Sequence, residues 1–161
     1  MIVQLPEFRT ANKAPTMKSL IQILLIALVF TMPASADEDQ AGLRYWNGIN
    51  KDAITTSSGL QYKILVSGKG RKPEAKDRVT VHYRGLFLDG TQFDSSYSND
   101  EPVTLSLKRV IEGWTEGIQF MPTGSVFVFL IPPELAYGEK GGGPIPPNAT
   151  LIFEVELFGI K

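Results

Sequence analysis

The chain has 161 residues, of which 43% are hydrophobic and 20% charged, and its formal net charge is −1 at pH 7. These proportions are ordinary for a globular protein with one domain. The balanced charge gives no electrostatic support for nucleic-acid binding, the lack of cysteine excludes disulfides and thiolate zinc sites, and the single histidine excludes a histidine-rich metal site within one chain.

The first 36 residues have the features of an export signal. Lys18 provides a positive charge, Leu20 to Phe30 is apolar, and residues 34–36 (ASA) fit a cleavage site. The alternative is a retained membrane anchor, but the apolar run falls short of the roughly 20 residues that span a bilayer. We predict an N-terminal extension and cleavable signal peptide over 1–36, with Met17 as a possible start of translation and an exported mature protein.

Residues 37–58 are polar and have no clear apolar period. They contain Tyr45, Trp46 and a run of four hydroxyl residues at 55–58. We interpret this segment as a polar arm or linker that leads into the domain.

From Gly59 onward the pattern is typical of β-structure. Alternating or continuous apolar residues predict strands, and Asp89-Gly90 predicts a hairpin turn because both residues tolerate a positive φ. His82 alternates onto the polar side of its strand, which favours a structural or solvated role over a catalytic one. The predicted strands cover 60–66, 79–88, 91–95, 103–107, 126–131 and 151–160.

Only residues 113–120 look helical, and Met121-Pro122 ends the pattern. One short helix beside several strands predicts an α+β domain over 59–161. We expect a twisted, mainly antiparallel β-sheet of about five to six strands wrapped around that helix. The Pro- and Gly-rich segment 132–150 should be an ordered loop, and long ordered loops are usually functional.

The sequence has no motif for nucleophilic, phosphate-binding or zinc-dependent chemistry. The glycine run at 141–143 lacks the following lysine and helix of a phosphate-binding loop. We therefore expect no cofactor and no metal ion.

Several stretches of the chain resemble the signature sequences of the FKBP-type peptidyl-prolyl cis-trans isomerases. They are VHYRGLFLDGTQFDSS at 81–96, VIEGWTEGIQFM at 110–121, PPELAYG at 132–138 and IPPNATLIFEVEL at 145–157. The lead-in TTSSGLQYKIL at 55–65 resembles that of secreted bacterial members such as the macrophage infectivity potentiator group. The resemblance covers 59–161 and implies an FKBP-like fold. It also implies non-covalent isomerisation of Xaa-Pro bonds during folding of exported proteins, in the periplasm or outside the cell.

The resemblance also implies the residues of the site. Trp114 would form the floor of a pocket, Asp94 and Tyr137 would be polar groups at its rim, and the Ile111 N–H would donate to a peptide carbonyl. The implied catalytic residues are Asp94, Tyr137, Tyr83, Phe93, Trp114 and Phe153. The implied substrate- and inhibitor-binding residues are Tyr83, Phe93, Asp94, Val103, Val110, Ile111, Trp114, Tyr137, Ile145 and Phe153.

Departures from the family pattern leave the preferred substrate side chain and the tacrolimus affinity open. Val103 stands where the family usually has a bulkier aromatic residue, and residues 97–100 lack an arginine found in many eukaryotic members. The implied partners are proline-containing segments of unfolded exported proteins and macrolides such as tacrolimus, with no nucleic acid and no stable membrane insertion after signal cleavage. We expect a monomer, because 37–58 is too short for a long dimerisation helix.

Two other interpretations remain open at this point. A non-catalytic proline-peptide-binding module or chaperone could use the same fold, because a fold does not dictate function. A structural cell-surface domain would have no pocket at all, and residues such as Trp114 and Phe153 would then belong to an ordinary core.

Overall fold

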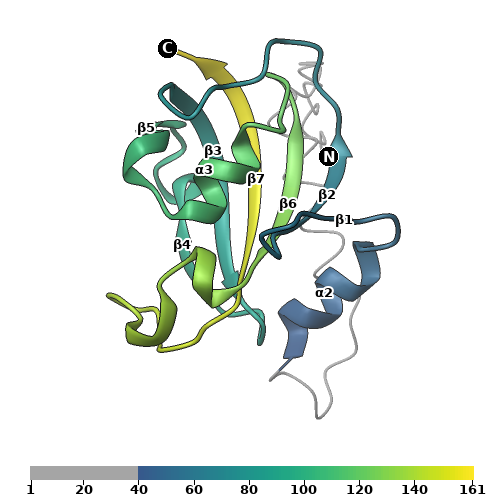
Figure 1. Cartoon of the computed structure of the whole chain (residues 1–161), viewed down its shortest axis with the longest axis vertical. Coiled ribbons are helices and arrows are strands. Elements are labelled where there is room, and N and C mark those ends of the chain that lie inside the picture. Colours follow the sequence, from purple (N-terminus) through teal and green to yellow (C-terminus); the bar gives the residue numbers. More distant parts are fainter. Residues whose placement is uncertain (1–39) are drawn as a thin grey trace, which may run out of the picture. The chain divides into compact units, whose positions relative to one another are not determined.

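The computed structural model describes residues 40–161, which lie within one compact unit, 37–161. Figure 1 draws these residues in colour. The predicted extension, signal peptide and alternative start at Met17 lie outside the described residues.

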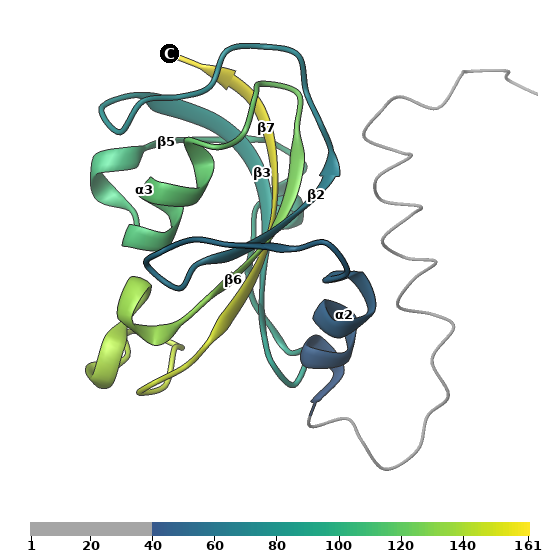
Figure 2. The same ribbon diagram turned by 45° about the vertical axis from the view of Figure 1, so that its right-hand side comes forward.

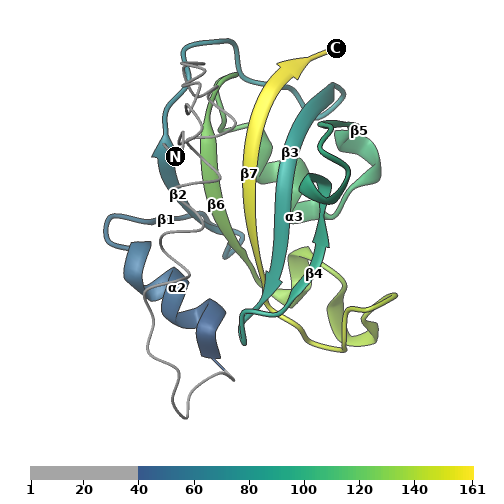
Figure 3. The same cartoon turned by 180° about the vertical axis from the view of Figure 1, so that it is seen from behind.

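A seven-stranded antiparallel sheet forms the body of this unit (Figure 1). The strand order is β1-β2-β6-β7-β3-β4, and β5 pairs with β3 off this path. Figure 3 shows the long strand β7 between β6 and β3, as the register requires. The predicted α+β class and antiparallel sheet are confirmed, and the unpredicted strand is the two-residue β1. The strands are β1 Ile54–Thr55, β2 Gln61–Val66, β3 Arg78–Phe87, β4 Gln92–Ser95, β5 Val103–Ser106, β6 Val126–Ile131 and β7 Leu151–Ile160.

Helix α3 (Glu112–Ile118) covers one face of the sheet, and two glycines set its distance from β6. A Cβ atom at Gly113 would lie 2.6 Å from Ile131 Cγ2, and one at Gly117 would lie 2.6 Å from Phe129 Cε1. Residues four apart share a helix face, so both glycines point at the sheet. The helix therefore packs with its backbone close to β6.

The main hydrophobic core lies between α3 and the sheet. The apolar run of β6 is buried on both faces almost throughout, as its sequence predicts. The largest core side chains that have almost no exposed surface are Leu60, Leu107, Ile118, Met121, Phe127, Phe129, Ile131, Leu151 and Leu157.

The expectation that 113–120 is the only helix is wrong, because a second helix, α2 (Ala41–Ile49), lies within the predicted arm. Figure 2 shows α2 and α3 on opposite sides of the sheet. Trp46 is only 2% exposed and packs with Leu86, Val128 and Ile152 in a separate core. A nine-residue helix has little stability alone, so this packing is what stabilises it.

A close backbone approach also holds α2 in place. A Cβ atom at Gly42 would lie 2.2 Å from the Phe87 carbonyl oxygen, so only glycine fits there. The Leu43 N–H donates to the Leu88 carbonyl oxygen at 2.8 Å. The apolar stripe of α2 is too short to stand out in the sequence, which is why the helix was not predicted.

The face of the sheet that carries α2 holds a buried ion pair. The alternating pattern of β7 places Glu154 on this face, where it is 4% exposed. The Arg84 guanidinium lies 2.9 Å from its carboxylate, and the Tyr45 hydroxyl of α2 donates to the same side chain. A buried carboxylate requires such partners, because leaving it unpaired would be strongly destabilising.

His82 is buried, and its Nδ1 lies 2.9 Å from the Ser96 hydroxyl. Its ring stacks on Tyr97 with centroids 4.4 Å apart. Of the two roles that the sequence left open, structural or solvated, the structure therefore selects the structural one.

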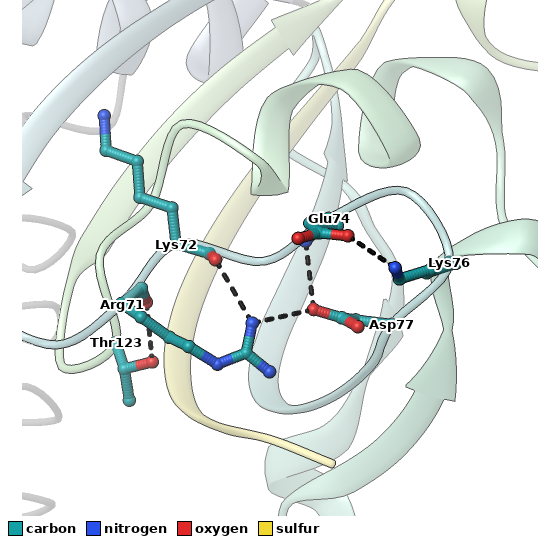
Figure 4. A network of polar contacts seen from close by, with 6 residues as sticks. All are labelled: Arg71, Lys72, Glu74, Lys76, Asp77 and Thr123. Carbon is teal, nitrogen blue, oxygen red and sulfur yellow. Dashed lines mark hydrogen bonds and ion pairs between the residues drawn. The ribbon is translucent and has the colours of Figure 1, made fainter.

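A surface network fastens the connection between β2 and β3 (Figure 4). Arg71 forms a 3.0 Å ion pair with Asp77, whose carboxylate also accepts from the Glu74 N–H at 3.0 Å. The Arg71 carbonyl accepts from both the N–H and the hydroxyl of Thr123. The Glu74 N–H is the main cause that lowers the pKa of Asp77.

The segment 132–150 is ordered, as predicted, and contains two short 3₁₀-helices. The four 3₁₀-helices of the described residues after α2 are η2 Ser96–Asn99, η3 Leu107–Arg109, η4 Pro133–Leu135 and η5 Gly138–Lys140. Within residues 40–161, neither α-helix has the length and apolar character that crossing a bilayer requires.

We predict that Trp46→Ala destabilises the protein by about 3 kcal/mol, because truncating a buried tryptophan leaves a cavity. Denaturant unfolding followed by circular dichroism measures the change. Asn47→Ala, on the exposed side of the same helix, is the matched control and should change stability little. Equal stability of both variants would mean that α2 is not an integral part of the folded unit.

Candidate active site

A cavity of about 360 Å³ opens on the α3 side of the sheet. This volume is in the range of small-ligand sites, which are concave and largely apolar with a few polar groups. Its walls come from strands, from α3, from η3 and from the 132–150 loop. The lining residues are Tyr83, Asp94, Leu105, Arg109, Val110, Ile111, Trp114, Tyr137 and Phe153.

Three aromatic rings form the floor and inner wall. Trp114, in the first turn of α3, is 4% exposed. The rings of Tyr83 and Phe153 stand nearly perpendicular to it, with centroid distances of 5.1 Å and 5.3 Å. Edge-to-face pairs of this kind are favourable, and close packing keeps the nearly buried rings of Trp114 and Phe153 in place. The cavity therefore has a rigid aromatic base.

Gly85 allows one further ring, that of Phe93, to pack behind Phe153. A Cβ atom at Gly85 would lie 2.6 Å from Phe93 Cζ and 2.9 Å from Phe153 Cε1. Phe93 and Phe153 are perpendicular, with centroids 5.5 Å apart. Phe93 thus supports the wall from behind and does not line the cavity.

The polar groups gather at the rim. The Tyr83 hydroxyl donates to Asp94 Oδ2 at 2.6 Å. Burial, followed by this carboxylate, raises the pKa of Tyr83 well above its usual value, so the hydroxyl keeps its proton at alkaline pH values where a free tyrosine ionises. Tyr137 projects from the long loop and is 42% exposed, which leaves its hydroxyl accessible to a ligand.

The backbone at Ile111 offers a further donor. Ile111 is the N-cap residue of α3, and its carbonyl accepts from the N–H groups of Trp114 and Thr115. Its own N–H makes no hydrogen bond to another residue in 40–161. A donor without a protein partner at the edge of a cavity can bind a carbonyl group of a ligand.

The structure brings most of the predicted site residues together around the cavity. Three of them lie elsewhere. Phe93 stands behind the wall, Ile145 is buried in the main core, and Val103 in β5 packs against that core. Valine has a short side chain, and at position 103 it does not reach the cavity. The predicted residues that line the cavity are Tyr83, Asp94, Val110, Ile111, Trp114, Tyr137 and Phe153.

Two lining residues, Leu105 and Arg109, were not predicted from the sequence. Leu105 lies on the same strand face as Val103 and Leu107, because residues two apart in a strand point to the same side. The sequence therefore predicted that its side chain points inward, but not that it lines the cavity. Arg109 directly precedes the predicted site residues Val110 and Ile111, and this neighbourhood is the only feature of the sequence that indicates its place at the cavity.

Among the described residues, the cavity lacks a serine, threonine or cysteine nucleophile and a histidine base. In 40–161, no three His, Cys, Asp or Glu side chains are grouped to hold a metal ion. The His82–Ser96 contact is not a nucleophilic pair, because both side chains are buried and neither lines the cavity. What remains is an apolar cup with hydrogen-bonding groups at its rim, which suits non-covalent binding of a small apolar group next to an amide.

Comparison with known proteins identifies the family. Residues 69–158 match the model of the FKBP-type peptidyl-prolyl cis-trans isomerases, which is more than half of the chain. The chain belongs to this family. The resemblance predicted from the sequence is therefore confirmed.

Similar proteins include several bacterial members of the family. The chain is 56% identical over 115 residues to the FKBP-type peptidyl-prolyl cis-trans isomerase FkpA of Aeromonas hydrophila, covering 71% of this chain and 43% of that protein. It is 49% identical over 109 residues to the outer membrane protein MIP of Legionella longbeachae, covering 67% and 47%. The chain thus spans about half the length of these relatives or less.

Solved structures agree with the fold. The crystal structure of FkpA from Escherichia coli superposes with a TM-score of 0.69 at 37% identity, covering 91% of this chain and 73% of that one. The crystal structure of AtFKBP13 gives a TM-score of 0.65 at 35% identity, covering 68% and 99%.

We predict that stability falls as the pH rises above about 10. Burial is the main cause that raises the pKa of Tyr45, Tyr83 and Tyr97 in the folded state. In the unfolded chain these hydroxyls lose their protons near pH 10. The folded state then binds more protons than the unfolded state, and such a state loses stability as pH increases.

Chemical denaturation at a series of alkaline pH values measures this slope, and tyrosinate absorbance measures the titration. Tyr83→Phe removes one of the titrating groups and should flatten the slope. A stability that is constant from about pH 9 to pH 12, or folded-state titration of all tyrosines near pH 10, would contradict the prediction.

Proposed function

We propose that this chain is a peptidyl-prolyl cis-trans isomerase that accelerates Xaa-Pro isomerisation without a covalent intermediate. Membership of the FKBP-type family supports this function. The observation that carries the proposal is the cavity floored by Trp114, with the Tyr83–Asp94 hydrogen bond at its mouth. The cavity volume of about 360 Å³ is sufficient for a proline ring, and the rim groups can contact the amide next to it.

The chemistry needs no nucleophile. Rotation about a peptide bond meets a barrier of about 18–20 kcal/mol because resonance stabilises the planar form. The cis and trans forms of Xaa-Pro differ little in energy but exchange slowly. A site that binds the twisted amide more tightly than either planar form lowers this barrier. A thousandfold acceleration requires about 4 kcal/mol of such preference.

The residues of the cavity can supply this preference in two ways. A planar amide is more charge-separated than a twisted one, so an apolar cup of Trp114, Tyr83 and Phe153 disfavours the planar form relative to the twisted form. The Ile111 N–H can hold a peptide carbonyl in register, as the resemblance implies. Asp94 and Tyr137 can then orient or polarise the carbonyl that turns.

The alternative is a module that binds proline peptides on the same fold without catalysis. The cavity itself would serve both functions. The polar groups at the rim would serve peptide binding as well as catalysis, so the choice rests on the family, whose members are described as peptidyl-prolyl cis-trans isomerases. We therefore favour the isomerase.

The proposed substrates are proline-containing segments of unfolded exported proteins, and the proposed inhibitors are macrolides such as tacrolimus. The relative named outer membrane protein MIP supports an exported protein. The apolar segment and cleavage pattern in 1–36 agree with export to the periplasm or the outside. We further propose that the mature protein is a monomer.

The decisive experiment measures cis-trans exchange of Xaa-Pro tetrapeptides with the purified chain. We expect catalysis by the wild type and a loss of about tenfold or more in kcat/KM for Asp94→Ala, because a hydrogen bond to a charged group contributes about 1.5–3 kcal/mol. Asp94 is exposed, so the variant should fold normally.

Glu101→Ala removes an exposed carboxylate that does not line the cavity and is the matched control. It should retain wild-type activity. A wild-type chain that binds proline peptides but does not catalyse exchange would favour the non-catalytic alternative. Full activity of Asp94→Ala would refute the role of the rim carboxylate.

Tryptophan fluorescence can test whether ligands enter the cavity. The chain has two tryptophans, and they lie in cores on opposite faces of the sheet. In Trp46→Phe, the remaining Trp114 should change its emission when tacrolimus binds. In Trp114→Phe, the remaining Trp46 should not respond. A response that persists in Trp114→Phe would place the ligand elsewhere.

A further inference from the structure

Arg109 is the one positively charged residue among those that line the cavity. It lies at the end of η3 and is exposed to solvent. The only carboxylate in the lining, Asp94, already accepts a hydrogen bond from Tyr83. The mouth of the cavity therefore has one acidic and one basic side chain, contributed by different elements.

The guanidinium of Arg109 has no ion pair or hydrogen bond to any residue in 40–161. A guanidinium carries five N–H donors in a planar arrangement that matches a carboxylate. These donors are available to a ligand without first breaking a contact to any of the described residues.

The backbone that carries Arg109 is anchored at its base. The Thr115 hydroxyl of α3 donates to the Leu107 carbonyl at 2.7 Å, and the Leu107 N–H donates to the Asp77 carbonyl at 3.0 Å. Leu107 itself is completely buried. Two residues after Arg109, the N–H of Ile111 has no partner within 40–161 and can bind a peptide carbonyl. A bound peptide would thus pass close to the guanidinium.

We propose that Arg109 makes this site prefer proline segments with an acidic residue, Asp or Glu, beside the proline over segments with a basic residue there. This inference rests on the proposed isomerase function and names its substrate class. The guanidinium attracts a carboxylate next to the proline and repels a lysine. The neighbouring Lys108 has the same charge but does not line the cavity, so it contributes less.

The test compares tetrapeptides in which Glu, Gln or Lys stands directly before the proline, and a second set with the same residues directly after it. In at least one set, wild-type kcat/KM should be about two- to fivefold higher for Glu than for Lys, the range of an exposed ion pair. This ratio should decrease as salt is added, because salt screens exposed charges.

Variants of Arg109 and Lys108 show whether the preference comes from a contact with the Arg109 guanidinium or from the positive charge of the whole segment. In Arg109→Gln, the ratio of Glu to Lys should fall to near one, whereas in Lys108→Gln it should stay close to the wild-type value. Arg109→Lys should keep part of the preference, because it retains the charge but not the planar set of donors.

The outcomes distinguish this inference from the proposed function. If the wild type catalyses none of the six peptides, the proposed function fails. If it catalyses the Gln peptides but does not discriminate Glu from Lys in either set, only the preference for acidic substrates is refuted. A preference that survives Arg109→Gln, or that disappears equally in Lys108→Gln, would also overturn the assignment to Arg109.

Discussion

The close packing of α3 on β6 is the constraint on which the site depends. Two glycines, Gly113 and Gly117, allow the helix backbone to approach Ile131 and Phe129 where any larger residue would collide. Trp114 lies between these glycines in the sequence, so the same approach sets how deep its ring sits. A helix held farther from the sheet would separate Trp114 from the perpendicular rings that complete the floor of the cavity.

One face of the sheet lines the cavity and the other face packs against α2. Because neighbouring residues in a strand point to opposite faces, each strand contributes to both. On β3, Tyr83 faces the cavity while Arg84 faces the other side, and on β7 the same holds for Phe153 and Glu154. The far face buries an ion pair under α2, whose Tyr45 bonds to the carboxylate. The strands that carry the aromatic wall are thus held from behind by charged and aromatic contacts.

The cavity combines a rigid apolar interior with adaptable polar groups at its mouth. Perpendicular aromatic rings leave the base little freedom to rearrange. At the rim, the Ile111 N–H and the Arg109 guanidinium have no partners within residues 40–161. Such an arrangement can hold a proline ring in one position and still discriminate among the residues beside it.

The sequence by itself determined the strands after Gly59, the helix near 113–120, the ordered loop and the family. These follow from local patterns, namely alternation, a hairpin dipeptide, a proline stop and motifs in register. Helix α2 could not be predicted in this way, because its largest buried side chain, Trp46, is recognisable as an anchor only when the apolar patch that receives it is present. Local periodicity carries no information about a distant partner.

The tertiary structure decided which of the implied residues meet at the cavity. The family resemblance implied Phe93, Val103 and Ile145 as site residues, but side-chain length and the approach of neighbouring strands place them behind the wall or in the core. The same packing brought Leu105 and Arg109 to the mouth. Whether a side chain lines a cavity depends on the volume left by residues far away in the chain, and only the folded arrangement defines that volume.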